Sequence, residues 1–209
     1  MGKEKRERFI NIENVVASAT LKQDIDLSTI VRLFPGVEYR PEQFPGLVYR
    51  LKKPKTATLI FSSGKMVCTG AKSERQSKKA VMKVVDELKR SGIVIVGKPD
   101  ITIQNIVASA GLGGSIDLEK SVYSLKKTMY EPEQFPGLIY RMDDPKVVIL
   151  LFASGKLVCT GAKKEEEVHR AVATLQKTLE EKELVHYASE KNLVSSPAVQ
   201  NHMSKLRAN

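Results

Sequence analysis

Two nearly identical stretches decide the organisation of this chain: Glu-Gln-Phe-Pro-Gly-Leu-Val-Tyr-Arg at residues 42–50 and Glu-Gln-Phe-Pro-Gly-Leu-Ile-Tyr-Arg at residues 133–141. They differ at one position and begin 91 residues apart. The same offset relates Asn14 to Asn105 and holds through most of each half without insertion or deletion. Self-similarity at a fixed period indicates an internal duplication. We therefore divide the 209 residues into an N-terminal segment (1–8), two repeats (9–97 and 98–186) and a tail to which we assign no role (187–209).

The chain is strongly basic, with 34 Lys and Arg against 24 Asp and Glu, a formal net charge of +10 and an isoelectric point of about 9.5. A charge of this sign favours a polyanionic partner such as nucleic acid, although ribosome-associated and merely soluble basic proteins share it. The most apolar later run, Val147–Phe152, is far too short to span a bilayer. We expect a protein of the cytoplasm that has no membrane partner.

Two cysteines, Cys68 and Cys159, occupy equivalent positions in the two repeats. A pair of thiols provides neither a disulfide framework nor a zinc quartet, so we expect them to be reduced, buried and small apolar side chains. The sequence predicts neither a metal nor a cofactor.

Each repeat has the same expected order of elements: a long strand, a short helix, about four strands and a long helix. Residues 9–21 and 101–110 are rich in β-branched side chains, which favours the long strands. A short helix follows Asp24 and Asp26, which are suitable caps, and a helix with apolar residues on one face follows Ser73. One long helix per repeat can cover only one face of an antiparallel sheet.

The uncovered face of this sheet is also apolar. Side chains alternate across a strand, so the helix-covered set of Ile60, Met66 and Cys68 leaves an opposite set exposed in each repeat. That set is Leu59, Phe61 and Val67 in the first repeat and Leu150, Phe152 and Val158 in the second. Either the two repeats stack these faces into a sandwich, or the chain keeps an open apolar concave surface for a partner.

A basic protein with an apolar, Asn-bearing sheet face suits the minor groove of DNA. The groove floor presents mainly acceptors, and proteins enter it by inserting apolar side chains between base steps. Asn14 and Asn105 can donate amide hydrogens to adenine N3 or thymine O2. The residues expected to tolerate A·T pairs and to clash with a guanine amino group are Val16, Val107, Thr69 and Thr160. The candidate wedges are Phe44, Phe61, Phe135 and Phe152.

The chain resembles the archaeal-type TATA-binding proteins over about residues 9–183. The resemblance is carried by Asn-Val-Val-Ala-Ser (14–18), by both Glu-Gln-Phe-Pro-Gly-Leu segments, and by Phe-Ser-Ser-Gly-Lys-Met-Val-Cys-Thr-Gly-Ala-Lys (61–72), each with its counterpart 91 residues later. It implies an α+β saddle of two pseudo-symmetric repeats, with a ten-stranded curved antiparallel sheet and helices on the convex face. It also implies a general transcription factor that binds and bends TATA-like promoter DNA, for which the family is itself a standard example of minor-groove wedging.

The resemblance assigns roles to individual residues. Phe44 with Phe61, and Phe135 with Phe152, are the wedge pairs, while Asn14 and Asn105 lie over the centre of the DNA site. The side chains that line the base edges are Val16, Leu59, Val67, Thr69, Val107, Leu150, Val158 and Thr160. Arg50, Lys65, Arg141 and Lys156 contact phosphates. Glu131, Glu133 and Gln134 of the second loop contact transcription factor B, which brings in RNA polymerase indirectly.

Two other function classes remain open at this point. A DNA glycosylase with a related saddle needs a catalytic carboxylate or lysine beside a base pocket. The sequence shows no such constellation, because His169, His186 and His202 are scattered, so we do not expect an enzyme. A paralogue that uses the saddle for non-promoter DNA or for protein contacts is the alternative. The high basic charge further implies strong non-specific DNA binding with a steep salt dependence.

Overall fold

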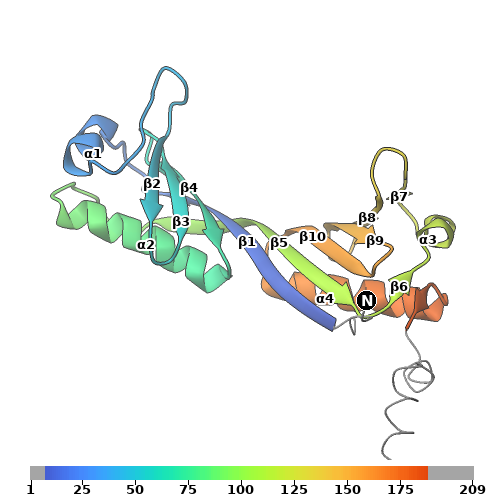
Figure 1. Cartoon of the computed structure of the whole chain (residues 1–209). Helices are drawn as coiled ribbons and strands as arrows, with labels where there is room; N and C mark the ends of the chain where they lie inside the picture. Colours follow the sequence, from blue (N-terminus) through green and yellow to red (C-terminus); the bar gives the residue numbers. More distant parts are fainter. Residues whose placement is uncertain (1–7, 188–209) are drawn as a thin grey trace, which may run out of the picture.

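A nine-stranded antiparallel sheet forms the body of the molecule (Figure 1). The computed structural model describes residues 8–187. In the first repeat the elements are β1 (Arg8–Thr20), α1 (Leu27–Leu33), β2 (Leu47–Leu51), β3 (Thr56–Ile60), β4 (Lys65–Ala71) and α2 (Glu74–Arg90). In the second they are β5 (Asp100–Leu112), β6 (Ser115–Ile116), α3 (Leu118–Ser124), β7 (Thr128–Met129), β8 (Gly137–Met142), β9 (Val147–Phe152), β10 (Lys156–Ala162), α4 (Glu165–Glu181) and β11 (Val185–His186). The strand order is β2-β3-β4-β1-β5-β10-β9-β8-β7, and β11 pairs with β6 in a separate small sheet.

The two repeats join through the antiparallel pairing of β1 with β5. Val15 pairs with Ile106 at the centre, Asn14 pairs with Val107, and Val16 with Asn105, so the pairing is symmetric about this point. Because the ladder makes one continuous sheet, the repeats do not stack face to face. The sandwich alternative is therefore wrong.

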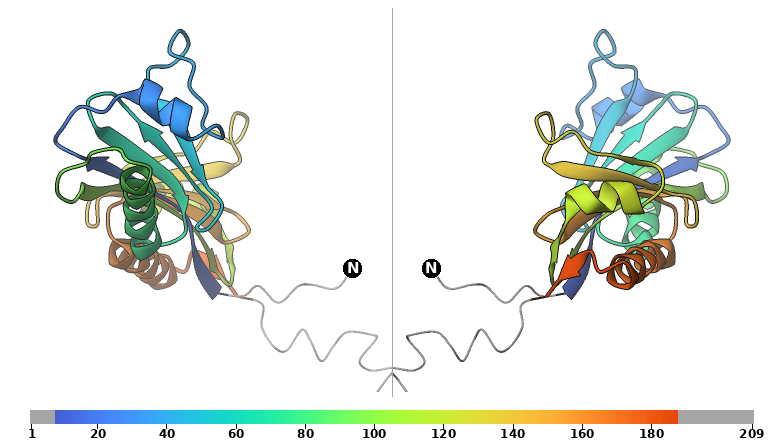
Figure 2. Two further views of the ribbon diagram at one scale, coloured as in Figure 1. Left: turned by 90° about the vertical axis from the view of Figure 1, so that its left-hand side faces the viewer. Right: turned by 90° about the vertical axis from the view of Figure 1, so that its right-hand side faces the viewer.

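Both long helices, α2 and α4, lie on the same side of the sheet (Figure 2). The alternation in β9 shows which residues they cover: Val147, Ile149 and Leu151 are buried, whereas Val148, Leu150 and Phe152 are only half-buried. Burial of apolar area at about 25 cal/mol per Å² is the main stabilising term for such a layer. The expectation of an apolar sheet face left uncovered by the long helices is confirmed.

The expected tenth strand is reduced to a single bridge. In the second repeat, Thr128 and Met129 pair with β8 as strand β7, but at the equivalent place only Glu38 bridges to Val48. The turn at Pro35-Gly36 precedes this bridge, and both residue types are unfavourable in strands because Pro lacks an N–H and Gly loses more backbone entropy. The saddle of two repeats stands, with nine strands in place of ten.

Helix α2 begins with the expected Ser73 cap, whose Oγ accepts from Gln76 N at 3.0 Å. The Gln76 side chain, however, accepts from Lys72 N at 2.6 Å, one residue earlier than a capping box requires.

The two long helices also meet at their N-termini. The backbone N–H of Glu74 donates to Glu165 Oε1, and that of Glu165 donates to Glu74 Oε1, each at 2.7 Å. This reciprocal capping across the repeats satisfies amides that have no partner inside a helix.

The core of the first repeat contains two hydroxyls without a partner. Thr58 Oγ1 on β3 and Ser77 Oγ on α2 are fully buried, and neither has a hydrogen-bond partner in the described part of the chain. The equivalent residues in the second repeat are Ile149 and Val168, both fully buried and apolar. The repeats therefore share a fold but not the polarity of the layer between sheet and long helix.

We predict that Thr58→Val and Ser77→Ala each raise the free energy of unfolding by about 1 kcal/mol, because a buried hydroxyl without a partner costs on the order of 1–3 kcal/mol. Chemical denaturation measures the change. Thr56→Val is the matched control, since the Thr56 hydroxyl donates to Pro54 O at 3.4 Å and its removal gains less. A loss of stability in both variants would contradict the prediction.

Candidate nucleic-acid interface

The sheet face opposite the long helices is visible in Figure 1, and the burial pattern of the strands places on it the side chains that the sequence singled out. Most of them come from strands of the nine-stranded sheet, at the alternate positions that the helices leave open, while Phe44, Phe61 and Phe135 lie just outside the strands. The half-buried members are Asn14, Val16, Leu59, Phe61, Val67, Thr69, Asn105, Val107, Leu150, Phe152, Val158 and Thr160. The result is a mainly apolar face that carries two amides near its centre.

Two phenylalanine pairs stand at opposite ends of this face. The rings of Phe44 and Phe61 lie 5.8 Å apart at 67°, and those of Phe135 and Phe152 lie 5.8 Å apart at 64°. Both are edge-to-face arrangements, which are favourable for aromatic rings. Phe44 is 41% and Phe135 is 37% exposed, so neither is a core residue. Each pair presents a large rigid apolar surface to solvent.

A glycine beside each pair makes this geometry possible. A Cβ on Gly46 would lie 2.5 Å from Phe44 Cε1 and 3.0 Å from Phe61 Cε1. The equivalent distances at Gly137 are 2.6 Å to Phe135 Cε1 and 3.0 Å to Phe152 Cε1. The Pro-Gly step in the repeated motif therefore lets the ring fold back onto its own chain.

The central asparagines are held in one orientation by a bulge in the neighbouring strand. Asn14 Oδ1 accepts from the backbone N–H of Gly70 at 2.7 Å, while its Nδ2 donates to Thr69 Oγ1 at 3.1 Å. Gly70 has a φ of +98°, and the register of β1 against β4 shifts here. Asn105 repeats these contacts with Gly161 at 2.7 Å and Thr160 at 3.3 Å. Because Nδ2 carries two hydrogens and donates only one to the threonine, each amide retains one hydrogen for a ligand acceptor.

The four expected phosphate contacts are all exposed side chains on or beside this face. Arg50 is not free, because its Nε pairs with Glu38 Oε1 at 3.0 Å. Lys65, Arg141 and Lys156 form no ion pair among residues 8–187. Exposed ion pairs contribute little to stability, so the Arg50 pair can exchange for a stronger anion.

Sequence reasoning missed a second polar pair beside the asparagines. Ser109 Oγ donates to Glu13 Oε1 at 2.7 Å, and in the symmetric position Gln104 Nε2 donates to Ser18 Oγ at 2.7 Å. The hydrogen bonds from Ser109 and then Lys72, with the charge of Lys72, lower the pKa of Glu13. The 91-residue offset already relates Glu13 to Gln104 in the sequence. The register of β1 against β5, which brings each of them to a serine, could not be predicted from the sequence.

The loop between α1 and β2 and the loop between β7 and β8 project on the side of the sheet away from the long helices, one from each repeat (Figure 1). They share one backbone turn, in which the N–H of Phe44 donates to Arg40 O and that of Phe135 to Glu131 O, both at 2.9 Å. The same turn therefore displays a cation in one repeat and a carboxylate in the other. Glu131, Glu133 and Gln134 are all exposed in the second loop.

Other kinds of site are not found in the described residues. Within residues 8–187, no group of three or more His, Cys, Asp or Glu side chains gathers where it would hold a metal ion. No helix there has both the length and the apolar character needed to cross a membrane. Both cysteines are buried, and burial raises the pKa of Cys68 and raises that of Cys159 to about 11, so both thiols stay protonated at neutral pH.

Comparison with known proteins places this geometry in a family. The sequence model of the family described as transcription factor TFIID (or TATA-binding protein, TBP) matches twice, at residues 9–91 and 100–182. A TATA-box-binding protein from Sulfurisphaera tokodaii is 55% identical over 184 residues, which are 88% of this chain and 93% of that protein. One from Pyrodictium occultum is 59% identical over 169 residues, 81% of this chain and 85% of the relative. The solved structure described as Methanococcus jannaschii TBP superposes with a TM-score of 0.75 at 50% identity and covers 82% of this chain and 98% of its own.

We predict that Gly46→Ala and Gly137→Ala weaken binding to an A·T-rich duplex by roughly tenfold each, because the added methyl displaces the exposed phenylalanine ring beside it and a loss of about 1.4 kcal/mol corresponds to tenfold in affinity. Fluorescence anisotropy measures the affinity. Gly36→Ala is the control, since a Cβ there meets nothing within 4 Å. Equal affinity of the two glycine variants and the unaltered chain would contradict the packing argument.

Proposed function

Because the chain belongs to the TATA-binding protein family, we propose that it is a general transcription factor that binds and bends TATA-like promoter DNA through the minor groove. The observation that carries the proposal is the two phenylalanine pairs at the ends of one apolar sheet face, each with one exposed ring. The curated relatives are named for binding the TATA box. As a promoter-binding factor of an archaeal-type cell, the protein would act in the cytoplasm, on the nucleoid.

The centre of the face would recognise A·T pairs because they have no guanine amino group in the minor groove. Minor-groove edges of A·T pairs present only acceptors, whereas a G·C pair adds the guanine amino group. The oriented amides of Asn14 and Asn105 each have one hydrogen for such an acceptor. Val16 and Val107 lie directly opposite Asn105 and Asn14 in the β1–β5 ladder and would leave no room for the amino group.

The ends of the face supply the bend. Insertion of an aromatic ring between base pairs unstacks one step, which costs a few kcal/mol and is offset by the protein surface that bent DNA can cover. Phe61, which directly follows β3, and Phe152, the last residue of β9, pack against Phe44 and Phe135 of the loops, so each wedge is supported from behind. Arg50, Lys65, Arg141 and Lys156 would hold the phosphates on either side, which makes the affinity fall steeply with salt.

The acidic second loop is our candidate for the contact with transcription factor B, through which the complex would recruit RNA polymerase. Glu131 and Glu133 are exposed and lie in a loop whose backbone turn is fixed by hydrogen bonds to Glu131 O. The first loop has the same turn but begins with Arg40. A basic partner would therefore bind one end of the saddle and not the other.

We predict that Phe61→Ala combined with Phe152→Ala abolishes the bend and lowers the affinity for a TATA-like duplex by at least roughly a hundredfold, since each large-to-small change in a fully desolvated contact costs on the order of 2 kcal/mol or more. Energy transfer between dyes at the two duplex ends measures the bend. Tyr123→Ala is the control, because that aromatic is 92% exposed on α3. An unchanged bend in the double variant would overturn the wedge assignment.

We predict that Glu131→Arg combined with Glu133→Arg abolishes recruitment of transcription factor B to the DNA complex while the affinity for DNA changes by less than about threefold, because reversal of two partner-facing charges turns attraction into repulsion. A supershift assay reports both quantities. Glu42→Arg, at the position in the first loop equivalent to Glu133, serves as the control. Full recruitment by the double variant would remove the second loop from the interface.

A further inference from the structure

Phe9, at the start of β1, is an exposed aromatic residue outside the two phenylalanine pairs. It is 36% exposed, which is close to the 37% of Phe135. In the β1–β5 ladder Phe9 pairs with Gly111, and the next residue, Ile10, pairs with Ala110. Ile10 and Ala110 belong to the core beneath the long helices. Because side chains alternate across a strand, Phe9 lies on the opposite face, which is the proposed DNA face.

Gly111 lies on that face too, in alternation with Val107 and Ser109 along β5. Val107 and Ser109 are half-buried, but Gly111 is buried although it has no side chain of its own. It pairs with Phe9 on one neighbouring strand and with Lys156 on the other. An aromatic ring beside a glycine can cover the bare backbone. We call Phe9, Gly111 and Lys156 the phenylalanine row.

The duplicated sheet contains a symmetric row with different side chains. Thr20 pairs with Asp100 on β5 and with Lys65 on β4, and these three residues correspond to the phenylalanine row through the 91-residue offset. Each row therefore keeps a lysine that is expected to meet a phosphate. In this aspartate row, however, a carboxylate takes the place of the ring, and it lies 3.9 Å from Lys22 Nζ.

Arg8 anchors the end of β1 from the other side of the sheet. Its Nη2 donates to Glu180 Oε1 on α4 at 3.3 Å and to the Tyr187 hydroxyl at 3.1 Å. Its Cζ also lies 5.2 Å from the centre of the Tyr187 ring. The strand end that carries Phe9 is therefore ordered before any ligand binds. A side chain on an ordered strand loses less conformational entropy on binding than one on a free terminus.

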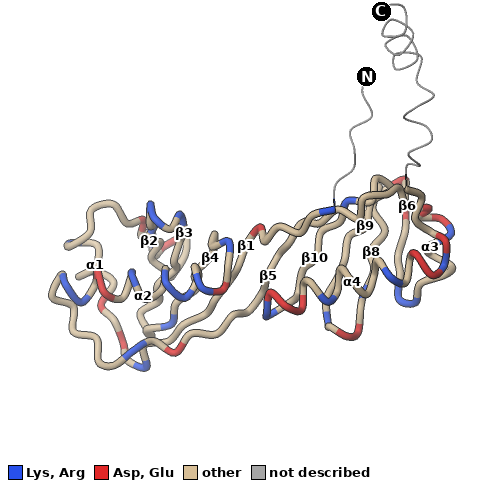
Figure 3. The backbone as a smooth tube through the Cα atoms, turned by 90° about the horizontal axis from the view of Figure 1, so that it is seen from below, with Lys and Arg blue, Asp and Glu red and all other residues tan. Residues whose placement is uncertain are grey.

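The two central strands carry little charge. β1 and β5 contain three charged residues, Arg8, Glu13 and Asp100, and Figure 3 shows both strands as mostly tan. DNA backbone that passes the two ends of this ladder would meet Asp100 at one end and Phe9 at the other. A carboxylate repels a phosphate, whereas an aromatic ring can pack on the apolar edge of a deoxyribose.

We propose that Phe9 is a further DNA-binding residue, which packs against the deoxyribose backbone next to the phosphate contact of Lys156. This inference rests on the proposed function and deepens it. At one end of the ladder the DNA backbone is held by a lysine and an aromatic ring, and at the other by a lysine whose attraction Asp100 weakens. An apolar contact releases no counterions, so it adds affinity without adding to the salt dependence.

Salt titration separates the two kinds of contact. Fluorescence anisotropy measures the affinity of the full chain for a TATA-like duplex from about 0.1 to 0.5 M KCl. Phe9→Ala should lower the affinity about fivefold at every salt concentration and leave the slope of log affinity against log salt unchanged. Lys156→Ala should reduce that slope by about 1. Asp100→Asn should raise the affinity about threefold.

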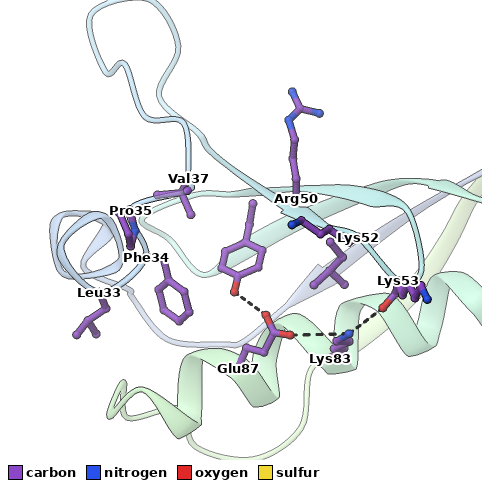
Figure 4. Close-up of a pocket in the computed structure, with 12 residues that line it drawn as sticks. Leu33, Phe34, Pro35, Val37, Arg50, Lys52, Lys53, Lys83 and Glu87 are labelled. Carbon is purple, nitrogen blue, oxygen red and sulfur yellow. Dashed lines mark hydrogen bonds and ion pairs between the residues drawn. The ribbon is translucent and has the colours of Figure 1, made fainter.

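Leu33→Ala is the matched control. Leu33 is 45% exposed and lies beside the cavity between α1, β2 and α2, away from the DNA face (Figure 4). Its truncation should change the affinity by less than about twofold. Chemical denaturation of every variant reports folding.

Photocrosslinking separates a DNA contact from a residue that only covers Gly111. Replacement of Phe9 by p-benzoyl-phenylalanine should give a light-dependent crosslink to the DNA backbone, because the benzophenone reacts with C–H bonds that it touches. The same replacement of Leu33 should give no crosslink.

The outcomes distinguish this inference from the proposed function. Equal affinity of Phe9→Ala and the unaltered chain, an altered salt slope in Phe9→Ala, or the lack of a crosslink from position 9 would each overturn the inference and leave the phenylalanine wedges in place. A TATA-like duplex that the unaltered chain does not bind would overturn both.

Discussion

The antiparallel pairing of β1 with β5 is the interaction on which the rest of the molecule depends. It joins two duplicated halves into one sheet, and its symmetric centre at Val15 and Ile106 places Asn14 and Asn105 on either side of the pseudo-two-fold axis. On the other side of the sheet, the reciprocal bonds between Glu74 and Glu165 join the N-termini of the two long helices. Two helix N-termini that face each other both carry a partial positive charge and would repel. Here the glutamate carboxylate of each helix accepts from the backbone N–H of the other, so the contact is favourable.

A continuous sheet with helices on one side has a consequence for its other side. Every second side chain of each strand then lies on the face that no long helix covers. In this chain that face is apolar, with half-buried Leu59, Val67 and their counterparts. Exposure of such a surface to water costs free energy unless a ligand covers it. At the two ends of the face, Gly46 and Gly137 leave room for the rings of Phe44 and Phe135 to pack beside them. The apolar surface therefore continues to both ends.

Much of this could be predicted from the sequence, because alternation and a fixed 91-residue offset are local signals. They predicted the two repeats, the open sheet face and the side chains that line it, while the pairing of the phenylalanines came from the family resemblance. They did not give the bulges at Gly70 and Gly161, which orient the asparagines, or the Glu74–Glu165 link, since these depend on how distant segments meet. The prediction of a tenth strand was wrong. In the first repeat the Pro35-Gly36 turn reduces the pairing to the Glu38–Val48 bridge, although the second repeat forms a strand at the equivalent place.

The way in which the two repeats diverge bears on how a nearly symmetric protein can act with direction. On the sheet face the copies agree in the asparagines, the phenylalanine pairs and the bulge glycines, so a two-fold DNA element would bind in either orientation with similar free energy. At the loops and sheet edges the copies differ in the sign of their charges: Arg40 of the first repeat corresponds to Glu131 of the second, and Lys52 corresponds to Asp143. A difference between two orientations requires a contact that only one of them makes. In this chain the charges that differ in sign lie at the loops and sheet edges, so a partner that tells the two orientations apart would have to contact those places.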